Sequence, residues 1–124
     1  MIKSMLFSIF ARAYLLSGRV PLIRLIYYFL FRLLLPRCVE IQRSRMLLGS
    51  LREPDRTLSM ILGTYEKFET ELFKKSIKEG DTVVDVGAHV GYYTLLAARL
   101  VGNTGRVYAF EPEPENYTFL VKNI

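Results

Sequence analysis

The chain has 124 residues and a mass of 14.4 kDa, which suits one small domain, since a domain usually takes about 100 to 200 residues. Hydrophobic residues make up 51% and charged residues 23% of the chain, so a disordered polypeptide is excluded. The single cysteine, Cys38, and the single histidine, His89, exclude an internal disulfide and a cysteine-based zinc site. No metal site is expected.

The net charge of +5 is divided unevenly along the chain. Residues 1–50 carry eight Lys or Arg against the single acid Glu40, a net charge of +7, whereas residues 51–124 carry a net charge of −2. The basic part is also the more hydrophobic one, with 31 apolar residues among its 50. This combination favours an anionic membrane surface over nucleic acid, which is bound by basic and polar surfaces. No nucleic-acid partner is therefore expected.

Residues 1–50 are predicted to be a hydrophobic, basic helical segment that precedes a separate domain in residues 51–124. The sequence from Leu22 to Leu35 is bracketed by Pro21 and Pro36. A proline at the first helical position and a second one just beyond the end are typical helix boundaries. This part of the segment is therefore predicted to be one helix.

The polar residues of this helix, Arg24, Tyr28 and Arg32, fall on one narrow stripe, so the helix is expected to be buried almost all round. Three interpretations stay open: the helix packs on its own protein, lies in a membrane interface, or spans the bilayer. Spanning is the least favoured, because the two arginines interrupt the apolar stretch. The expected location is the cytoplasm, with peripheral attachment to the inner face of the membrane as one alternative.

Residues from Thr64 onward show a different pattern. Tyr65, Phe68, Leu72 and Phe73 recur at helical spacing, and Gly80 is expected to end this helix as a left-handed cap. A further helix is expected to begin near Pro114, with Glu113 and Glu115 close to its positive end.

Two short strands are predicted, Thr82–Val86 and Arg106–Phe110, with a helix over residues 91–101 and a turn over residues 102–105 between them. A crossover of this length implies that the strands are parallel. Two parallel strands cannot bury both faces of a sheet, so the sequence indicates the opening part of a larger α/β domain. The strand side chains expected to be uncovered are Val83, Val84, Val107 and Phe110.

The segment from Asp85 to Gly91 joins the first strand to the helix after it. Such a loop offers exposed backbone N–H groups and the positive end of a helix dipole at the carboxyl edge of the sheet, where nucleotide-like ligands bind. Glu111, twenty residues after Gly91, follows the second strand, where an acid can accept hydrogen bonds from both ribose hydroxyls. The loop and the acid together predict a site for a ribose-containing cofactor.

Two departures from the dinucleotide-binding pattern G-x-G-x-x-G indicate which cofactor this is. His89 replaces the middle glycine, and an imidazole hinders the close approach of a pyrophosphate at that point. Asp85 places a carboxylate two residues before Gly87, where it attracts a positive charge and repels a phosphate. S-adenosylmethionine fits both features, because it contains adenosine without phosphate and carries an ammonium and a sulfonium group.

The sequence from Gly80 to Thr94, followed by the sequence from Gly105 to Pro112 and by Asn116, resembles the FkbM family of S-adenosylmethionine-dependent methyltransferases. The likeness covers about residues 60–124, and His89 stands where family members often have asparagine. The resemblance implies a seven-stranded Rossmann-like fold and methyl transfer, commonly to a hydroxyl oxygen of a small molecule or a sugar. It fixes neither the acceptor nor a catalytic base.

We therefore expect residues 51–124 to form the cofactor-binding β-α-β part of a Rossmann-like methyltransferase domain. The expected cofactor-binding residues are Asp85, Gly87, Ala88, His89, Gly91 and Glu111. We expect the 124 residues alone to be inactive, because two strands complete neither the core nor an acceptor pocket. An NAD-dependent Rossmann oxidoreductase and a non-enzymatic, membrane-associated interaction protein are the two alternatives. His89 is expected to be a loop side chain rather than a general base.

Overall fold

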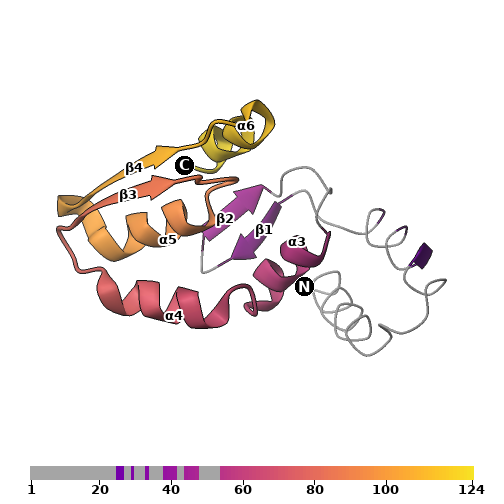
Figure 1. The fold of residues 1–124 in the computed structure, drawn as a ribbon, viewed down its shortest axis with the longest axis horizontal. Helices are drawn as coiled ribbons and strands as arrows, with labels where there is room; N and C mark the ends of the chain where they lie inside the picture. Colours follow the sequence, from indigo (N-terminus) through magenta and orange to yellow (C-terminus); the bar gives the residue numbers. More distant parts are fainter. Residues whose placement is uncertain (1–24, 27–28, 30–32, 34–37, 42–43, 48–53) are drawn as a thin grey trace.

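The computed structural model describes residues 25, 26, 29, 33, 38–41, 44–47 and 54–124 (Figure 1). Helices and strands alternate from α4 onward, as expected for an α/β fold. The elements in chain order are β1 (Cys38–Ile41), β2 (Ser44–Leu47), α3 (Pro54–Leu62), α4 (Lys67–Ser76), β3 (Thr82–Val86), α5 (Tyr92–Val101), a 3-10 turn (Gly102–Thr104), β4 (Arg106–Phe110) and α6 (Pro114–Asn123).

β3 and β4 form a parallel pair, with Thr82 opposite Arg106 and Val86 opposite Phe110. Both strands have the bounds that the sequence predicted, and their parallel pairing is confirmed. α5 connects them and packs against both strands (Figure 1). Because parallel strands end at the same edge of a sheet, the loop after β3 and the residue after β4, Glu111, emerge side by side.

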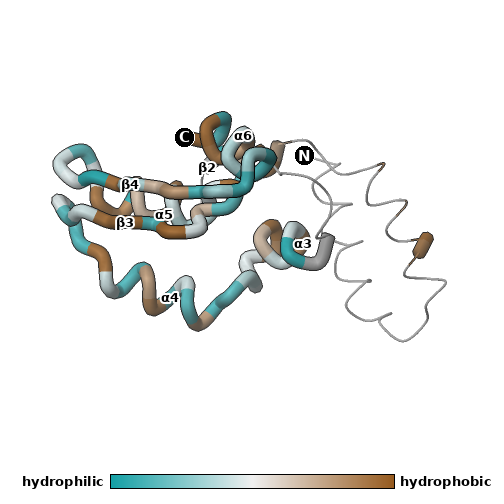
Figure 2. Tube along the Cα trace, turned by 45° about the horizontal axis from the view of Figure 1, so that its top comes forward, coloured by the Kyte–Doolittle hydropathy of each residue, from teal (hydrophilic) through white to brown (hydrophobic). Residues whose placement is uncertain are grey.

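The two faces of this strand pair differ in exposure, because side chains alternate along a strand. Val83 and Val107 are half-buried on the face that α5 covers, which corrects the expectation that both would be uncovered. Val84 and Phe110 are exposed, as expected. The strands are hydrophobic over most of their length (Figure 2). The apolar side chains left exposed on the opposite face are Val84, Val86, Tyr108 and Phe110.

α4 is shorter than predicted, because it ends at Ser76 and is followed by an extended residue, Ile77. Gly80 is left-handed, with φ of 87°, but it belongs to the turn before β3 and donates its N–H to the carbonyl oxygen of Val101 at 2.8 Å. Hydrophobic and hydrophilic residues alternate along the helix (Figure 2). Phe68 and Leu72, expected on its apolar side, are 77% and 55% exposed.

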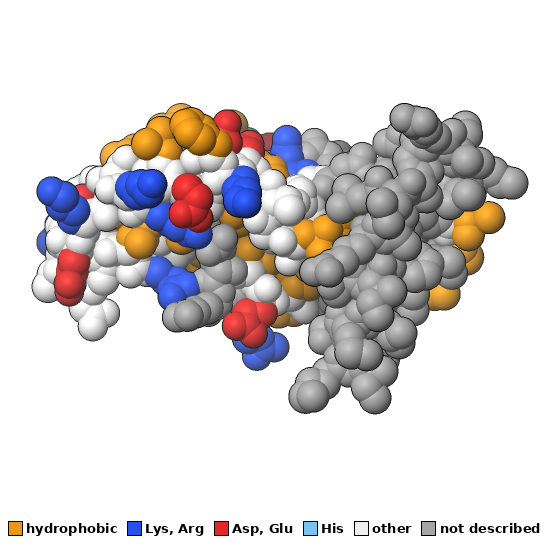
Figure 3. Space-filling view, turned by 90° about the horizontal axis from the view of Figure 1, so that it is seen from below, with side chains coloured by type: hydrophobic (Ala, Val, Ile, Leu, Met, Phe, Trp, Pro, Cys, Tyr) orange, Lys and Arg blue, Asp and Glu red, His pale blue; other side chains and the backbone are white. Residues whose placement is uncertain are grey.

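The side of the molecule on which α4 lies carries scattered Lys, Arg, Asp and Glu side chains (Figure 3). Hydrophobic side chains gather along one edge of the same view. The buried residue of α4 is Thr70, and Phe73 contacts Tyr93 with ring centroids 5.0 Å apart. Polar and aromatic contacts to α5 therefore hold α4 in place.

An antiparallel hairpin of β1 and β2 replaces the helix that the sequence predicted for this part of residues 1–50. Ile41 is 5% exposed and Met46 is 1% exposed, whereas Arg45 points to solvent. Because side chains alternate along a strand, Ile41 and Met46 lie on the buried face of the pair, and Glu40 and Arg45 lie opposite each other on the exposed face. The division of the chain at residue 50 stays a prediction, although the hairpin packs against elements on the other side of that boundary.

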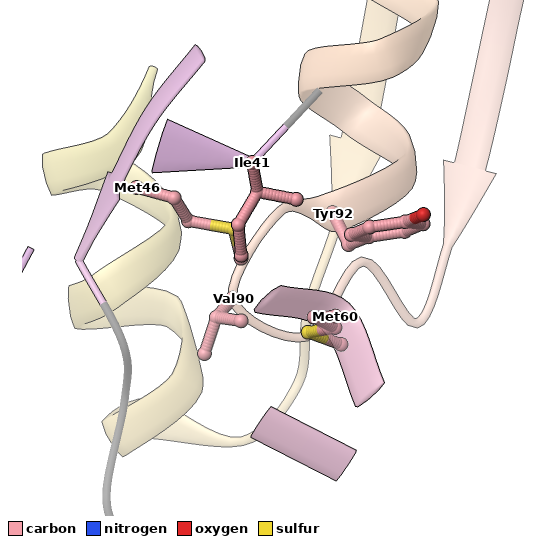
Figure 4. Close-up of a cluster of buried hydrophobic side chains, with 5 residues drawn as sticks. All are labelled: Ile41, Met46, Met60, Val90 and Tyr92. Carbon is pink, nitrogen blue, oxygen red and sulfur yellow. The ribbon is translucent and has the colours of Figure 1, made fainter. Parts of the chain in front are cut away.

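The buried core lies where the hairpin, α3, α5 and the loop before α5 meet. Its side chains converge from all of these elements (Figure 4). The members of the cluster are Ile41, Met46, Met60, Val90 and Tyr92. α3, which the sequence analysis did not predict, contributes Met60 and begins at Pro54, a favoured first helical residue. Tyr92 is 6% exposed and packs in this core.

Most of the predicted helix from Leu22 to Leu35 lies outside the described residues. The four residues of it that are described are helical and between 53% and 72% exposed, which corrects the expectation of a helix buried almost all round. They are Leu25, Ile26, Phe29 and Leu33. Within the part of the chain that the structure describes, no helix is long and apolar enough to cross a membrane.

α6 begins as predicted. Glu113 precedes its first residue, Pro114, and the Glu113 carboxylate accepts a hydrogen bond from the backbone N–H of Asn116 at 2.6 Å. Glu115 lies in the first turn. Both acids therefore stabilise the positive end of the helix.

The turn between α5 and β4 is tightly packed around Gly105. A Cβ atom on this residue would contact Val101 and would lie 2.7 Å from the carbonyl oxygen of Asp81, which accepts the N–H of Arg106. Only hydrogen fits between the end of α5 and the start of β4.

We therefore predict that Gly105→Ala lowers the free energy of unfolding of the protein by about 1 to 3 kcal/mol, because an added methyl group overpacks this turn. Urea unfolding measures the change. Asn103→Ala, at an exposed position of the same turn, is the control and should change stability by less than about 0.5 kcal/mol. Equal stability of the two variants would contradict the close packing.

Candidate functional site

The loop between β3 and α5 has an unusual backbone. Gly87, His89 and Gly91 have φ angles of 81°, 53° and 96°, all in the left-handed region. Glycine adopts this region readily, whereas His89 does so at a cost of roughly 1 to 2 kcal/mol. A Cβ atom on Gly91 would also lie 3.0 Å from Leu120 of α6. The loop therefore needs other contacts to keep this shape.

The backbone N–H groups of the loop are used within the protein. Gly87 and Ala88 both donate to the carbonyl oxygen of Phe110, at 2.8 and 3.0 Å. His89 donates its backbone N–H to Glu111 Oε2 at 2.7 Å. This corrects the expectation that the loop offers exposed N–H groups to a ligand. β4 accepts these bonds because its last residue lies directly opposite the end of β3.

Glu111 is fixed beside this loop. Its second oxygen, Oε1, accepts the backbone N–H of Glu113 at 2.9 Å. Burial acts to raise the pKa of Glu111, but the hydrogen bonds from Glu113 and His89 outweigh it and hold the pKa below its usual value of 4.5. An ionised carboxylate has about four acceptor positions. The backbone N–H groups of His89 and Glu113 and the side chain of Asn116 use three of these positions, so the carboxylate keeps room for a further hydrogen-bond donor.

Asp85 lies near the end of β3, on the half-buried face of the strand. Thr94 of α5 donates its hydroxyl to Asp85 Oδ2 at 2.6 Å, which orients the carboxylate. Asp85 also lines a cavity of about 320 Å³. The other residues around this cavity are Glu66, Glu69, Phe73, Val83, Val84, Val86 and Tyr93. The cavity is therefore apolar and aromatic, and the charges at its wall are acidic.

Tyr93 closes one side of this cavity as a neutral hydroxyl. It donates to Glu66 Oε2 at 2.7 Å and lies 3.5 Å from the Thr70 hydroxyl. Burial, followed by the neighbouring Glu66 carboxylate, raises the pKa of Tyr93 to about 12. The tyrosine is therefore a hydrogen-bond donor at neutral pH and carries no charge.

The contacts of the His89 side chain do not favour the role of a general base. Its Nε2 lies 3.4 Å from a guanidinium nitrogen of Arg56 in α3, and an arginine can only donate. The proton of a neutral imidazole then lies on Nδ1, which is buried and has no partner among the described residues. The geometry supports the expected role of a loop side chain.

The structure thus brings the loop residues and Glu111 together and places Asp85 on the same strand as the start of the loop. Sequence reasoning missed Thr94, which orients Asp85, and Arg56, which contacts His89. A polar residue in the first turn of the helix after the loop could have indicated Thr94. Arg56 gave no local signal, because its partner is 33 residues away.

Comparisons with known proteins identify methyltransferases among the proteins that this chain resembles. A family model described as the TRM5/TYW2 methyltransferase domain matches residues 60–124. A probable cobalt-precorrin-6B C(15)-methyltransferase (decarboxylating) of Saccharolobus solfataricus is 42% identical over 52 residues, which are 42% of this chain and 26% of that protein. Protein-L-isoaspartate O-methyltransferase 1 of Arabidopsis thaliana is 43% identical over 54 residues, 44% of this chain and 24% of that protein.

The matched part of the chain therefore spans about a quarter of the length of these curated relatives. Their names confirm the predicted class, methyltransferase, and imply S-adenosylmethionine as the cofactor. They support this class in general and do not single out the FkbM family.

We predict that the stabilising contribution of Glu111 is lost in acid. Its pKa is lower in the folded protein than in the unfolded chain, so this contribution is fully present above the unfolded value of 4.5 and declines as the pH falls through the folded pKa. The difference in free energy of unfolding between the protein and Glu111→Ala should stay constant between about pH 7 and pH 5.5 and narrow below 4.5. A difference that grows on acidification would contradict the two hydrogen bonds.

Proposed function

Because the chain belongs to the TRM5/TYW2 methyltransferase domain family, we propose that the protein transfers a methyl group from S-adenosylmethionine. We further propose that the cofactor binds at the carboxyl edge of β3 and β4. The residues proposed to contact it are Asp85, Gly87, Ala88, His89, Gly91 and Glu111. Family membership supports the reaction class, and the geometry of this edge supports the location.

The observation that carries the location is the fixed carboxylate of Glu111. Its two oxygens are held by the backbone N–H groups of His89 and Glu113, so the carboxylate cannot rotate freely. It is ionised at neutral pH and directly adjoins the glycine-rich loop. A rigid, charged acceptor at the end of the second strand suits the two hydroxyls of a ribose.

The same loop is poorly suited to pyrophosphate. Phosphate-binding loops present free backbone N–H groups, whereas Gly87, Ala88 and His89 donate theirs to Phe110 and Glu111. Asp85 adds a negative charge near the start of the loop. These features favour a cofactor without phosphate over a dinucleotide, and they weaken the alternative of an NAD-dependent oxidoreductase.

The chain contributes binding and orientation to the proposed reaction. S-adenosylmethionine supplies an electrophilic methyl group on a sulfonium centre when it is bound. Asp85, oriented by Thr94, provides negative charge for the cationic end of the cofactor, and Glu111 holds the opposite, ribose side. Holding a cofactor in one orientation is a main source of rate in a transfer that needs in-line geometry.

For the methyl acceptor we propose a chemical class and not a particular molecule. The resemblance to the FkbM family favours a hydroxyl oxygen of a small molecule or sugar. One relative is named for methylation at a carbon and the other for O-methylation of protein L-isoaspartate. The two relatives thus differ in the acceptor atom, and the proposal of oxygen rests on the resemblance to the FkbM family. None of the residues described at this edge is assigned as a catalytic base.

We predict that Glu111→Ala raises the dissociation constant of S-adenosylmethionine about tenfold or more, because charge-assisted hydrogen bonds contribute about 1.5 to 3 kcal/mol. Isothermal titration calorimetry of the protein measures the change. Glu113→Gln is the matched control, since it keeps the side-chain oxygen that accepts from Asn116 and leaves the backbone N–H bonded to Glu111. Unchanged affinity in Glu111→Ala would remove this residue from the site. Binding of NAD without binding of S-adenosylmethionine would overturn the proposed reaction.

A second proposal concerns residues 1–50, which we propose attach the protein to an anionic membrane surface on its cytoplasmic side. The segment carries a net charge of +7. Four of its apolar residues are exposed: Leu25, Ile26, Phe29 and Leu33. At the spacing of an α-helix, these four side chains fall within an arc of about 100° around the helix axis and so share one face. An exposed apolar stripe beside arginines is typical of helices that lie in a membrane interface.

We predict that the protein floats with anionic liposomes and that added salt or replacement of Arg24, Arg32 and Arg37 by Gln reduces the bound fraction, since each basic residue contributes about 1 kcal/mol. Liposomes of neutral lipid are the control. A deletion for the same test should end before Cys38, because Ile41 and Met46 belong to the core. Equal recovery in the unbound fraction with and without residues 1–36 would favour packing on the protein itself.

A further inference from the structure

The side chain of Asn123 joins three segments that are distant in the sequence. It lies at the end of α6, where its Oδ1 accepts the backbone N–H of Leu47 at 2.6 Å. Its Nδ2 donates to the carbonyl oxygen of Leu47 at 3.1 Å and to that of Val90 at 2.7 Å. One amide group thus holds the end of β2 and the glycine-rich loop at the same time.

The bond to Val90 satisfies a backbone group that the irregular loop leaves without a regular helix or strand partner. Val90 is 4% exposed and packs in the core beside Met46. A buried carbonyl group without a hydrogen bond is destabilising, because it loses its bond to water and gains none in the protein. The Asn123 amide supplies this bond from the far end of α6.

Two bonds from the segment around α6 therefore hold two consecutive loop residues. Glu111, before the helix, accepts the N–H of His89, and Asn123, at its end, donates to the carbonyl of Val90. His89 is the non-glycine residue of the loop with a left-handed backbone, which is the conformation most in need of external support. The loop shape depends on both bonds.

We infer that Asn123 is a positioning residue for the cofactor: it fixes the loop over residues 87–91 in its binding shape and couples this shape to the β1–β2 hairpin. The inference rests on the proposed function of the loop. Asparagine suits the position because one short side chain must accept once and donate twice. An aspartate of the same size would accept from Leu47 but would repel the carbonyl oxygens of Leu47 and Val90.

The test compares Asn123→Asp, Asn123→Ser and Val101→Ala in the protein. We expect the dissociation constant of S-adenosylmethionine to rise about tenfold in Asn123→Asp and by a smaller factor in Asn123→Ser, whose hydroxyl can still donate once. Val101 is 2% exposed at the other end of α5, so Val101→Ala should lower the melting temperature without changing the affinity. This control separates loop positioning from general loss of stability.

A second readout does not need the cofactor. Amide hydrogen exchange of His89, whose N–H is bonded to Glu111, should speed up at least severalfold in Asn123→Asp relative to Val101→Ala. If the unaltered protein binds no S-adenosylmethionine, the proposed function fails, and this exchange rate still decides whether Asn123 fixes the loop. If Asn123→Asp does not fold, the same two measurements on Asn123→Ser decide whether Asn123 positions the loop. Affinity and exchange both equal to those of the unaltered protein would overturn the inference.

Discussion

The parallel register of β3 and β4 is the constraint on which the candidate site depends. It places Val86 opposite Phe110, so that one carbonyl at the end of β4 accepts the first two N–H groups of the loop. The next residue, Glu111, then reaches the third N–H, that of His89. A slip of one residue would turn every strand side chain to the other face and separate these partners. Strand pairing therefore builds the loop and the acid as one unit.

This unit is consistent with the cofactor proposed for the loop. The N–H groups of the loop form hydrogen bonds within the protein that hold its left-handed backbone in place. These groups therefore fix the shape of the loop and are not free to donate to a ligand. The carboxylates of Asp85 and Glu111 lie beside the loop, each oriented by a hydrogen bond of 2.7 Å or less. Two carboxylates with fixed orientation suit a cation that carries hydroxyl groups, because hydrogen bonds within the protein already set their orientation.

The described part of the chain keeps several apolar side chains in solvent. Val86 and Phe110 lie on the face of the strand pair opposite α5, and Phe68 on α4 is 77% exposed. In α/β folds both faces of a parallel sheet are covered. The match to a methyltransferase domain over residues 60–124, together with relatives about four times as long as the matched segment, fits a strand pair that forms part of a larger sheet.

The sequence by itself determined the parts of the structure whose signals are local. The β-branched run at residues 82–86 and the hydrophobic and aromatic run at residues 106–110 predicted the strand pair, because neighbouring residues set strand propensity. The glycines of the loop and the acid after the second strand predicted the candidate site, because they set turn geometry and supply a charge locally. Only the tertiary structure decided the hairpin over residues 38–47, whose strands are stabilised by side chains far along the chain. It also decided which loop groups stay available and the role of Asn123, whose partner Leu47 is 76 residues away. Hydrogen bonds across such distances leave no pattern in the sequence, because they form only after the elements have packed.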